Sequence, residues 1–571
     1  MRPDDDRVEL DPLGWLLGRL RRIRRLAPGV ENGDCCLQVC AASATVPDSE
    51  ALATRLLGPE GVVVRVSGRR DVDVFGPSGA PGWLALNEAY TVSALRDRLE
   101  AAPSANLDEH VEQRLWQALS SGGEGRSMRK VLVFVPTRSL CDTLSAHLAA
   151  TLPSRRDLQV LAHHGSLDRF RRERAEHLFS TRRDAVLVTT TTLEVGVDIG
   201  DVDLVTLVGA PPDTCSLLQR IGRAGRRIGR TRVLALARSE VDRAAFASML
   251  VSTRDGILES GRQARRWSVC VQQAASFVAQ NGSRGRRRQD LVDLARDVWP
   301  DTPAGTVDVI LDALVQGEYL EERRGRLILG ALWADAFDGS GGMHANLDAS
   351  GAGIPVVDAG TGEVIAHVAQ RSAIEKGIAL GGQVWDARNV NGEVLLTARG
   401  VGRARGGFRY ASRAAPTGGE FAVHVRRGLG FDERDAPVVL LDGEPIWLHF
   451  GGSAYQAALV SLLPFLRRLA GLGGLAVAGS LSGDRLHRAA AQEEQLRAAV
   501  ESIVESVEST LSPGPYHRLL PEAYRQRVAV DLFDARRFRT WLASRRVWEL
   551  HSGDPRMAAV RLVLSPDPGS A

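Results

Sequence analysis

Five arginines lie within the twelve residues from Gln219 to Arg230, and glycines separate several of them. A guanidinium is planar, always charged and able to donate two parallel hydrogen bonds, so a group of them can hold several phosphate oxygens. A solvated basic helix is the alternative, and it would be preferred for an isolated arginine run. The strings that lie upstream favour phosphate binding here.

Four consecutive threonines, 189 to 192, end an expected strand, and Asp198 follows them. Threonine hydroxyls and backbone groups can donate to a phosphodiester chain, and a carboxylate can accept from a ribose hydroxyl. Two further polar strings, Phe134–Arg138 and His163–Leu167, also come at strand ends. Open α/β sheets bind their ligands at such ends. A histidine read singly is more often a loop or core residue than a ligand, so the grouping carries the prediction.

Apolar runs predict the strands that position these strings, at 131–135, 158–162, 185–189 and 204–208, with helices at 139–152 and 169–179. Such continuous apolar strands fit a parallel sheet that is covered on both faces. Nearer the N-terminus we expect a helix over 10–26, a strand over 37–42, a helix that begins near Ser49 and stops at Gly58, and a strand over Val62–Val66. Strand, helix and strand in this order indicate a parallel α/β unit.

The pattern changes after residue 255. Residues 267–280, 289–298 and 304–316 predict three helices, and 319–329 predicts a hairpin, an order that resembles a winged helix. Short β-rich runs broken by glycine, Phe421–Val425 among them, suggest a small barrel or sandwich over 354–450. The remainder is expected to be mainly helical, with six apolar residues on one helix face: Leu496, Val500, Ile503, Val504, Val507 and Leu511.

Composition sets outer limits on the class of protein. The chain has 571 residues with 72 basic and 69 acidic side chains, and at about 100 to 200 residues per domain this length predicts three to five domains. A net charge of +3 means that nucleic-acid affinity must come from where the arginines sit. The six cysteines form no paired CxxC units, so we expect no metal site and no disulfide framework. Without a signal peptide or a long apolar run, we expect a cytoplasmic protein and no membrane partner.

Taken together, these strings resemble the second RecA-like lobe of a superfamily two (DEAD/DEAH-box) helicase. VLVFVPTR (131–138) is similar to motif IV, HHGSL (163–167) to the backbone-contact motif that follows it, TTLEVGVDI (191–199) to motif V and QRIGRAGR (219–226) to motif VI. Ser43-Ala44-Thr45 resembles motif III. The large helicase-related (Lhr-like) family is the most similar, through RWSVCVQQAASF (266–277), GIPVVDAGTGEVIAHV (353–368) and LGGQVW (380–385).

The resemblance implies a motor that uses ATP and Mg²⁺ and moves along a single nucleic-acid strand, DNA in preference to RNA. Arg223 and Arg226 would be arginine fingers on the γ-phosphate, Gln219 would support them, and Gly196 and Asp198 would contact the nucleotide. The residues expected to hold the tracking strand are Thr137, Arg138, His164, Gly165, Thr190 and Thr192.

Further nucleic-acid contacts are expected in the β-rich region. Trp385 matches a tryptophan of the family's barrel motif, and a core role is its alternative. Arg403 and Arg405 alternate with aromatic residues over 402–410, a composition that suits stacking on unpaired bases together with phosphate neutralisation. A plain β-hairpin is the alternative there.

One family feature is missing from this sequence. A helicase needs a glycine-rich loop that ends in Gly-Lys-Ser/Thr (Walker A), but the two lysines, Lys130 and Lys376, do not follow a glycine, and the acidic DEAH (Walker B) motif is absent too. The chain could be truncated, split or wrongly started. We expect a partner polypeptide that carries both motifs. The alternative is an ATPase-inactive scaffold or regulator that binds nucleic acid.

The predicted architecture is α/β, with a RecA-like parallel-sheet lobe at its centre. The expected divisions are a partial first RecA-like lobe at 1–105, the second lobe at 106–255, a winged helix at 256–340, a β-barrel-like module at 341–460 and a mainly helical region at 461–571.

Overall fold

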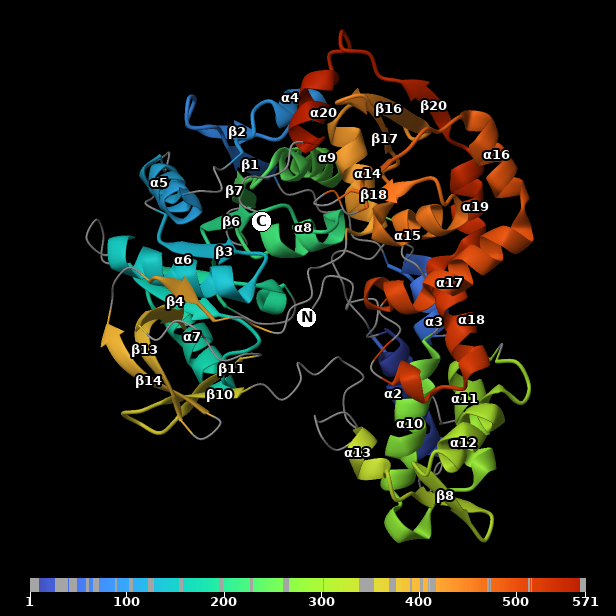
Figure 1. The fold of residues 1–571 in the computed structure, drawn as a ribbon. Helices are drawn as coiled ribbons and strands as arrows, with labels where there is room; N and C mark the ends of the chain where they lie inside the picture. The colour runs from blue at the N-terminus through green and yellow to red at the C-terminus, as the bar shows by residue number, and fades with distance from the viewer. Residues whose placement is uncertain are drawn as a thin grey trace.

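A computed structural model shows a mixed α/β protein built around a large sheet (Figure 1). It describes residues 10–564 apart from these segments: 26–38, 41–48, 58–60, 65–70, 88–89, 102–105, 122–127, 153–157, 195–198, 226–228, 260–265, 301, 338–353, 369–375, 391–392, 401–403, 409, 411–416, 470–471, 473, 512–513 and 515. Ser43-Ala44-Thr45 and most of the strand expected over 37–42 lie outside the described residues.

The central sheet has seven strands in the order β2-β1-β7-β6-β3-β5-β4. Its strands are β1 (Asp71–Phe75), β2 (Trp83–Ala85), β3 (Lys130–Phe134), β4 (Gln159–His163), β5 (Ala185–Thr189), β6 (Leu204–Val208) and β7 (Arg230–Leu236). All neighbours are parallel except β2, which is antiparallel to β1. The predicted RecA-like α/β fold and its four predicted strands are therefore confirmed.

Both faces of this sheet are covered, as its apolar strands predict. Val131 and Val133 belong to one core cluster and Leu132 and Phe134 to the other, because successive side chains of a strand point to opposite faces. The helices that cover the sheet are α4 (Val92–Arg96), α5 (Leu107–Ser120), α6 (Arg138–Thr151), α7 (Arg169–Thr181), α8 (Thr214–Ile221) and α9 (Glu240–Asp255).

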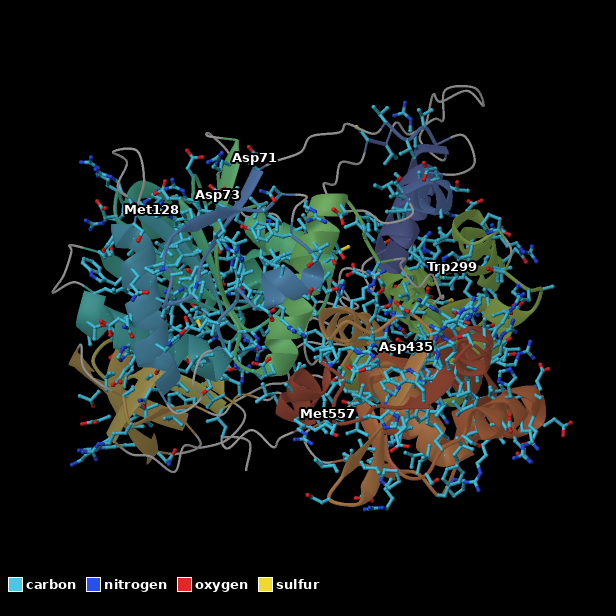
Figure 2. The ribbon with its side chains drawn as sticks, turned by 90° about the horizontal axis from the view of Figure 1, so that it is seen from above. Asp71, Asp73, Met128, Trp299, Asp435 and Met557 are labelled. Carbon is cyan, nitrogen blue, oxygen red and sulfur yellow. The ribbon has the colours of Figure 1, made fainter. Side chains whose placement is uncertain are left out.

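Part of the first lobe expected over 1–105 belongs to the sheet of the second lobe. Strand β1 pairs with β7, so residues 71–85 extend the second lobe's own sheet, and Asp71 and Asp73 mark this strand in Figure 2. No strand forms at Val62 and Val64, whose side chains are about four-fifths exposed.

Helices α2 (Leu10–Arg25) and α3 (Ser49–Leu57) form as predicted, but α2 packs against the winged-helix region and not against the main sheet. Trp15 of α2 is fully buried, with its ring edge-on to Trp299 at 5.4 Å. A Cβ at Gly18 would approach Val298 Cγ2 to 2.5 Å, so only glycine allows α2 to lie this close to its neighbour.

The winged-helix region consists of α10 (Trp267–Ala279), α11 (Arg288–Val298), α12 (Thr306–Gln316), the hairpin β8 (Leu320–Arg323) and β9 (Arg326–Leu329), and the short helix α13 (Trp333–Phe337). The three predicted helices and the predicted hairpin are confirmed. The next strands form a six-stranded sheet in the order β11-β10-β14-β13-β12-β15. They are β10 (Ile354–Asp358), β11 (Val364–Val368), β12 (Lys376–Leu380), β13 (Gln383–Val390), β14 (Glu393–Gly400) and β15 (Gly406–Gly407). We call residues 354–410 the β-module.

The C-terminal third differs from the prediction in two ways. Phe421–Val425, expected as a strand, lies inside the helix α14 (Gly419–Gly428). Ala422 and Val425 of this helix belong to the hydrophobic core that covers one face of the main sheet. The region expected to be mainly helical also supplies strands to a five-stranded sheet that crosses the expected boundary at 460, in the order β18-β19-β17-β16-β20. These are β16 (Asp435–Leu441), β17 (Glu444–Leu448), β18 (Arg467–Arg468), β19 (Ala476–Ala478) and β20 (Arg546–Glu549).

The helices of this third surround that sheet: α15 (Gly452–Leu462), α16 (Gly483–Ala491), α17 (Glu493–Leu511), α18 (Glu522–Phe533), α19 (Ala535–Ala543) and α20 (Met557–Leu564). On α17, Leu496, Val500 and Ile503 are buried as predicted. Among the described residues, no helix is both long enough and apolar enough to cross a membrane.

A buried histidine after β17 predicts acid sensitivity. His449 is fully buried, its Nδ1 accepts from the Gly451 backbone N–H at 3.0 Å, and burial lowers its pKa from 6.5 to about 3. The folded state holds the neutral ring, so stability is complete above pH 6.5 and falls as the pH drops toward 3. Between pH 7.5 and pH 5 the loss should be about 2 kcal/mol, and His449→Asn, which keeps an acceptor, should remove it. Native-state hydrogen exchange of the β16 and β17 amides at both pH values checks this, with the exposed His487→Asn as control. An unaltered pH dependence in His449→Asn would contradict it.

Candidate functional site

The carboxyl ends of β3, β4 and β5 bring four of the expected strand-contact residues together. Thr137 is exposed and caps α6, its Oγ1 accepting from the Leu140 backbone N–H at 3.2 Å. Arg138 donates from Nη1 to Ser166 Oγ at 2.8 Å and so ties the start of α6 to the loop after β4. A Cβ on Gly165 would lie 3.7 Å from Thr192 Cγ2, which places the loops after β4 and β5 in contact. One edge of the sheet therefore carries these groups.

His163 links the loop after β5 to the helix α7. Its Nδ1 lies 2.8 Å from Thr192 Oγ1, and its Nε2 lies 2.7 Å from Glu176 Oε1 on α7. Burial lowers the pKa of His163, while the hydrogen bond and charge of Glu176 act in the opposite direction. Thr190 is buried, and its backbone N–H donates to the His163 carbonyl at 3.4 Å. Residues 189–192, which we call the threonine loop, are thus held in a fixed position relative to β4.

His164 differs from its expected role. Its side chain is fully buried, with Nε2 3.2 Å from Asp142 Oδ1 of α6 and the ring 5.2 Å from that of Tyr410. Because the imidazole faces α6 and the β-module, it cannot also face a nucleic-acid strand in this arrangement. The first histidine of the pair, His163, points toward the threonine loop instead.

Glu194 joins the threonine loop to Arg220 and Arg223 of the arginine string, residues 219–230. Arg220, on α8, forms an ion pair with Glu194 Oε1 at 2.7 Å, with both side chains less than a tenth exposed, and its guanidinium lies 5.4 Å from the Phe134 ring centre. Arg223 donates from Nη2 to the Glu194 backbone carbonyl. This second contact is to a backbone carbonyl and not to a carboxylate.

The remaining expected nucleotide contacts are only partly described. Gln219 lies half-buried on α8, next to Arg220. Gly196, Asp198 and Arg226 lie outside the described residues.

In the β-module the structure distinguishes the two roles considered for Trp385, nucleic-acid contact and core packing. Trp385 is 2% exposed, its Nε1 donates to the Leu380 carbonyl at 3.0 Å, and it packs in the module's core. In this structure Trp385 has the core role that was its alternative, and no face of its indole is open. Arg405 is exposed, with its backbone N–H bound to the Gly377 carbonyl, and Arg403 lies outside the described residues.

Sequence reasoning missed three acidic residues that position the site: Asp142, Glu176 and Glu194. Glu194 stands within the motif V string, so its place was a signal. Asp142 and Glu176 sit on helices as ordinary polar residues, and nothing in the local pattern indicates that they face inward.

A further polar group lies where α8 meets the C-terminal region. Glu259 accepts from the Thr214 backbone N–H at 2.7 Å and lies 2.5 Å from His424 Nε2. Burial disfavours its charge, yet these hydrogen bonds lower the pKa of Glu259 to about 2. Asp213, Cys215 and Glu259 bring ligand atoms within 4.8 Å of one another. Both carboxylates already accept backbone N–H groups, so this geometry suits a helix N-terminus without a metal ion.

The comparisons with known proteins agree with the site. Residues 111–228 match the family described as Helicase conserved C-terminal domain. The chain is 34% identical over 194 residues to the ATP-dependent helicase Lhr-Core protein 2 of Thermococcus barophilus, covering 33% of this chain and 20% of that protein. It is 27% identical over 337 residues to the Lhr helicase/uracil glycosylase of Escherichia coli, covering 52% of this chain and 21% of that protein. The chain thus matches about a fifth of the length of these relatives.

A solved structure of Mycobacterium smegmatis helicase Lhr bound to ssDNA and AMP-PNP has a similar fold, with a TM-score of 0.52 and 17% identity over 91% of this chain and 75% of that one. Residues 111–228 thus form a helicase C-terminal domain, and the fold around it is similar to that of a solved Lhr helicase. The chain's resemblance to the Lhr-like family is confirmed.

Proposed function

We propose that this chain is the arginine-finger half of an Lhr-type helicase or translocase, which completes its nucleotide site with a phosphate loop and a DEAH motif on another polypeptide. The observation that carries the proposal is the link through Glu194, which holds Arg220 and Arg223 beside the threonine loop. A motor needs such a link, because nucleotide contacts must move together with contacts to the tracking strand.

In this proposal Arg223 and Arg226 stabilise the charge that develops on the γ-phosphate, Gln219 supports them, and Gly196 and Asp198 contact the nucleotide. Phosphoryl transfer is catalysed mainly by positioning and charge stabilisation, which guanidinium groups supply. Of these residues the structure describes Gln219 and Arg223. Mg²⁺ and the β-phosphate would be held by the lysine and acidic residues of the other polypeptide, since these 571 residues contain no Gly-Lys-Ser/Thr string.

Single-stranded DNA is the proposed strand, held by Thr137, Arg138, Gly165 and the threonine loop. Exposed Thr137 at the N-terminus of α6, together with backbone groups at the strand ends, offers donors for phosphate oxygens. The ssDNA-bound state of the Mycobacterium smegmatis protein supports this choice for a chain of the same fold.

Nucleic-acid-stimulated ATP hydrolysis tests the proposal. The purified chain is assayed with an oligonucleotide, alone and mixed with the product of a neighbouring gene that encodes the phosphate loop. Hydrolysis in the mixture alone supports the proposal, whereas hydrolysis by the chain alone overturns its two-chain part. If the chain binds the oligonucleotide but no combination hydrolyses ATP, the scaffold function replaces it, an alternative that the absence of a phosphate-loop lysine favours.

Two arginines of the β-module, Arg403 and Arg405, give a second test. If Arg403 and Arg405 each neutralise one phosphate, the double change to alanine should lower the salt slope of oligonucleotide binding by about 1.4, at about 0.7 per contact for single strands. Binding titrations at several salt concentrations measure the slope, and Arg182→Ala, at an exposed arginine of the main lobe, is the matched control. An unchanged slope would remove this strip from the binding surface.

A further inference from the structure

The loop after β4, residues 163–168, is held by the β-module as well as by its own lobe. The Asp168 backbone N–H donates to the Ile365 carbonyl at 2.8 Å, and the His367 backbone N–H donates to the Ser166 carbonyl at 2.9 Å. Leu167 and Ala366 form an antiparallel bridge between them. The loop therefore pairs with β11, the outer strand of the module's sheet.

Apolar burial strengthens this attachment. Leu167 is 4% exposed and packs within the module's own core, beside Val356, Ile365 and Trp385. A loop that contributes its central side chain to another unit's core cannot move without opening that core.

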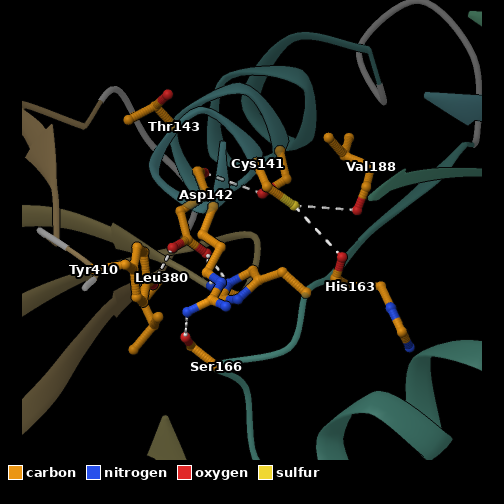
Figure 3. A network of polar contacts seen from close by, with 12 residues as sticks. Cys141, Asp142, Thr143, His163, Ser166, Val188, Leu380 and Tyr410 are labelled. Carbon is orange, nitrogen blue, oxygen red and sulfur yellow. Dashed lines mark hydrogen bonds and ion pairs between the residues drawn. The ribbon is translucent and has the colours of Figure 1, made fainter. Parts of the chain in front are cut away.

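Asp142 on α6 adds a polar connection to the β-module, and Figure 3 shows it together with Tyr410. Its carboxylate is fully buried on α6 and meets three donors: His164 Nε2 at 3.2 Å, the Gly381 backbone N–H at 2.8 Å and the Tyr410 hydroxyl. One donor comes from the loop and two from the β-module. Burial raises the pKa of Tyr410 well above 10, with the Asp142 charge acting in the same direction, so the phenol stays a donor at neutral pH.

The backbone of the β-module also lies close to α6 and to the loop. A Cβ on Gly407 would lie 3.0 Å from Ser139 Oγ, and one on Gly381 would lie 3.7 Å from Leu167 Cδ2. The helix that begins with Arg138 is therefore seated against the module along its first turns. Arg138 itself donates to Ser166 Oγ. The strings 134–138 and 163–167 are therefore both supported by the β-module.

We propose that the β-module is a positioning element of the nucleic-acid site, and that Tyr410 and Asp142 hold the loop 163–168 in the geometry that grips the strand. The proposal rests on the proposed function and adds a second unit to its site. Tyr410 and Asp142 touch no strand themselves: they act through His164 and the loop backbone. The module thereby gives the loop a fixed conformation before a strand arrives, which lowers the ordering cost of binding.

Tyr410→Phe tests the proposal, because it removes one hydrogen-bond donor and keeps the ring that packs against His164. We expect the affinity of the full chain for a single-stranded DNA oligonucleotide to fall about tenfold, since a hydrogen bond to a charged group is lost. The salt slope should stay unchanged, because no cationic side chain is removed. Amide hydrogen exchange should rise at residues 165–168 and His367. Tyr319→Phe, the same chemical change in the winged-helix hairpin region, is the matched control and should alter neither measurement.

Melting temperature separates positioning from general stability. A purely structural role would lower the melting temperature and leave the affinity, measured well below it, at the wild-type value. That outcome, or equal affinity and equal exchange in wild type and Tyr410→Phe, overturns the inference and leaves the proposed function intact. If the wild-type chain binds no oligonucleotide, the proposed function itself fails.

Discussion

Alanine in place of Arg223 should lower nucleic-acid-stimulated ATP turnover by about 10³-fold or more, in a preparation that contains both halves of the nucleotide site. An arginine finger contributes about 10³ to 10⁵ in rate because its guanidinium neutralises charge that exists only in the transition state. Arg223 donates a hydrogen bond to the Glu194 carbonyl, and that bond orients its guanidinium. Single-turnover hydrolysis with saturating oligonucleotide measures the effect.

Two controls give this prediction its meaning. Arg182→Ala removes an exposed arginine of the same lobe and should leave turnover within twofold. Oligonucleotide affinity of Arg223→Ala should remain near the wild-type value, since the finger acts on the nucleotide. If turnover, affinity and melting temperature all fell together, Arg223 would be a structural link between the two loops and not a finger.

The main lobe could be predicted from sequence because its signals are local. The strands at 130–134, 185–189 and 204–208 are mainly apolar runs, and the first two are followed by polar strings at their carboxyl ends. A parallel sheet aligns such ends at one edge, so the grouping of Thr137, Gly165 and Thr192 follows from the strand order alone.

The rest depended on contacts that no local pattern contains. The apolar stripe of α2 would fit any helix partner, and only the matching surface at Trp299 and Val298 decides where it packs. Phe421–Val425 has strand-like composition, yet it is helical because a helix can place Ala422 and Val425 on one face against the main core. Burial of His164 and Trp385 likewise depends on the docking of the β-module, which joins residues more than 200 positions apart.

The largest stability effect is expected at Arg220. Arg220→Met removes the partner of Glu194, whose side chain is only 5% exposed, and leaves a buried carboxylate without its counter-charge. Breaking one side of a buried pair costs about 3 to 5 kcal/mol, more than the pair itself contributes, because the remaining charge stays out of water. Native-state hydrogen exchange of the β5 and α8 amides measures this locally, which suits a chain of several domains where one global free energy is not defined.

The double variant Glu194→Met with Arg220→Met distinguishes charge burial from lost packing. If the uncompensated carboxylate is the cause, the double variant should recover much of the loss, since two apolar side chains of similar length need no solvation. Recovery of exchange protection without recovery of ATP turnover would then separate the two tasks of Glu194. The fold needs only that this space be filled, whereas turnover needs the charged pair, because it holds the arginine string in register with the threonine loop.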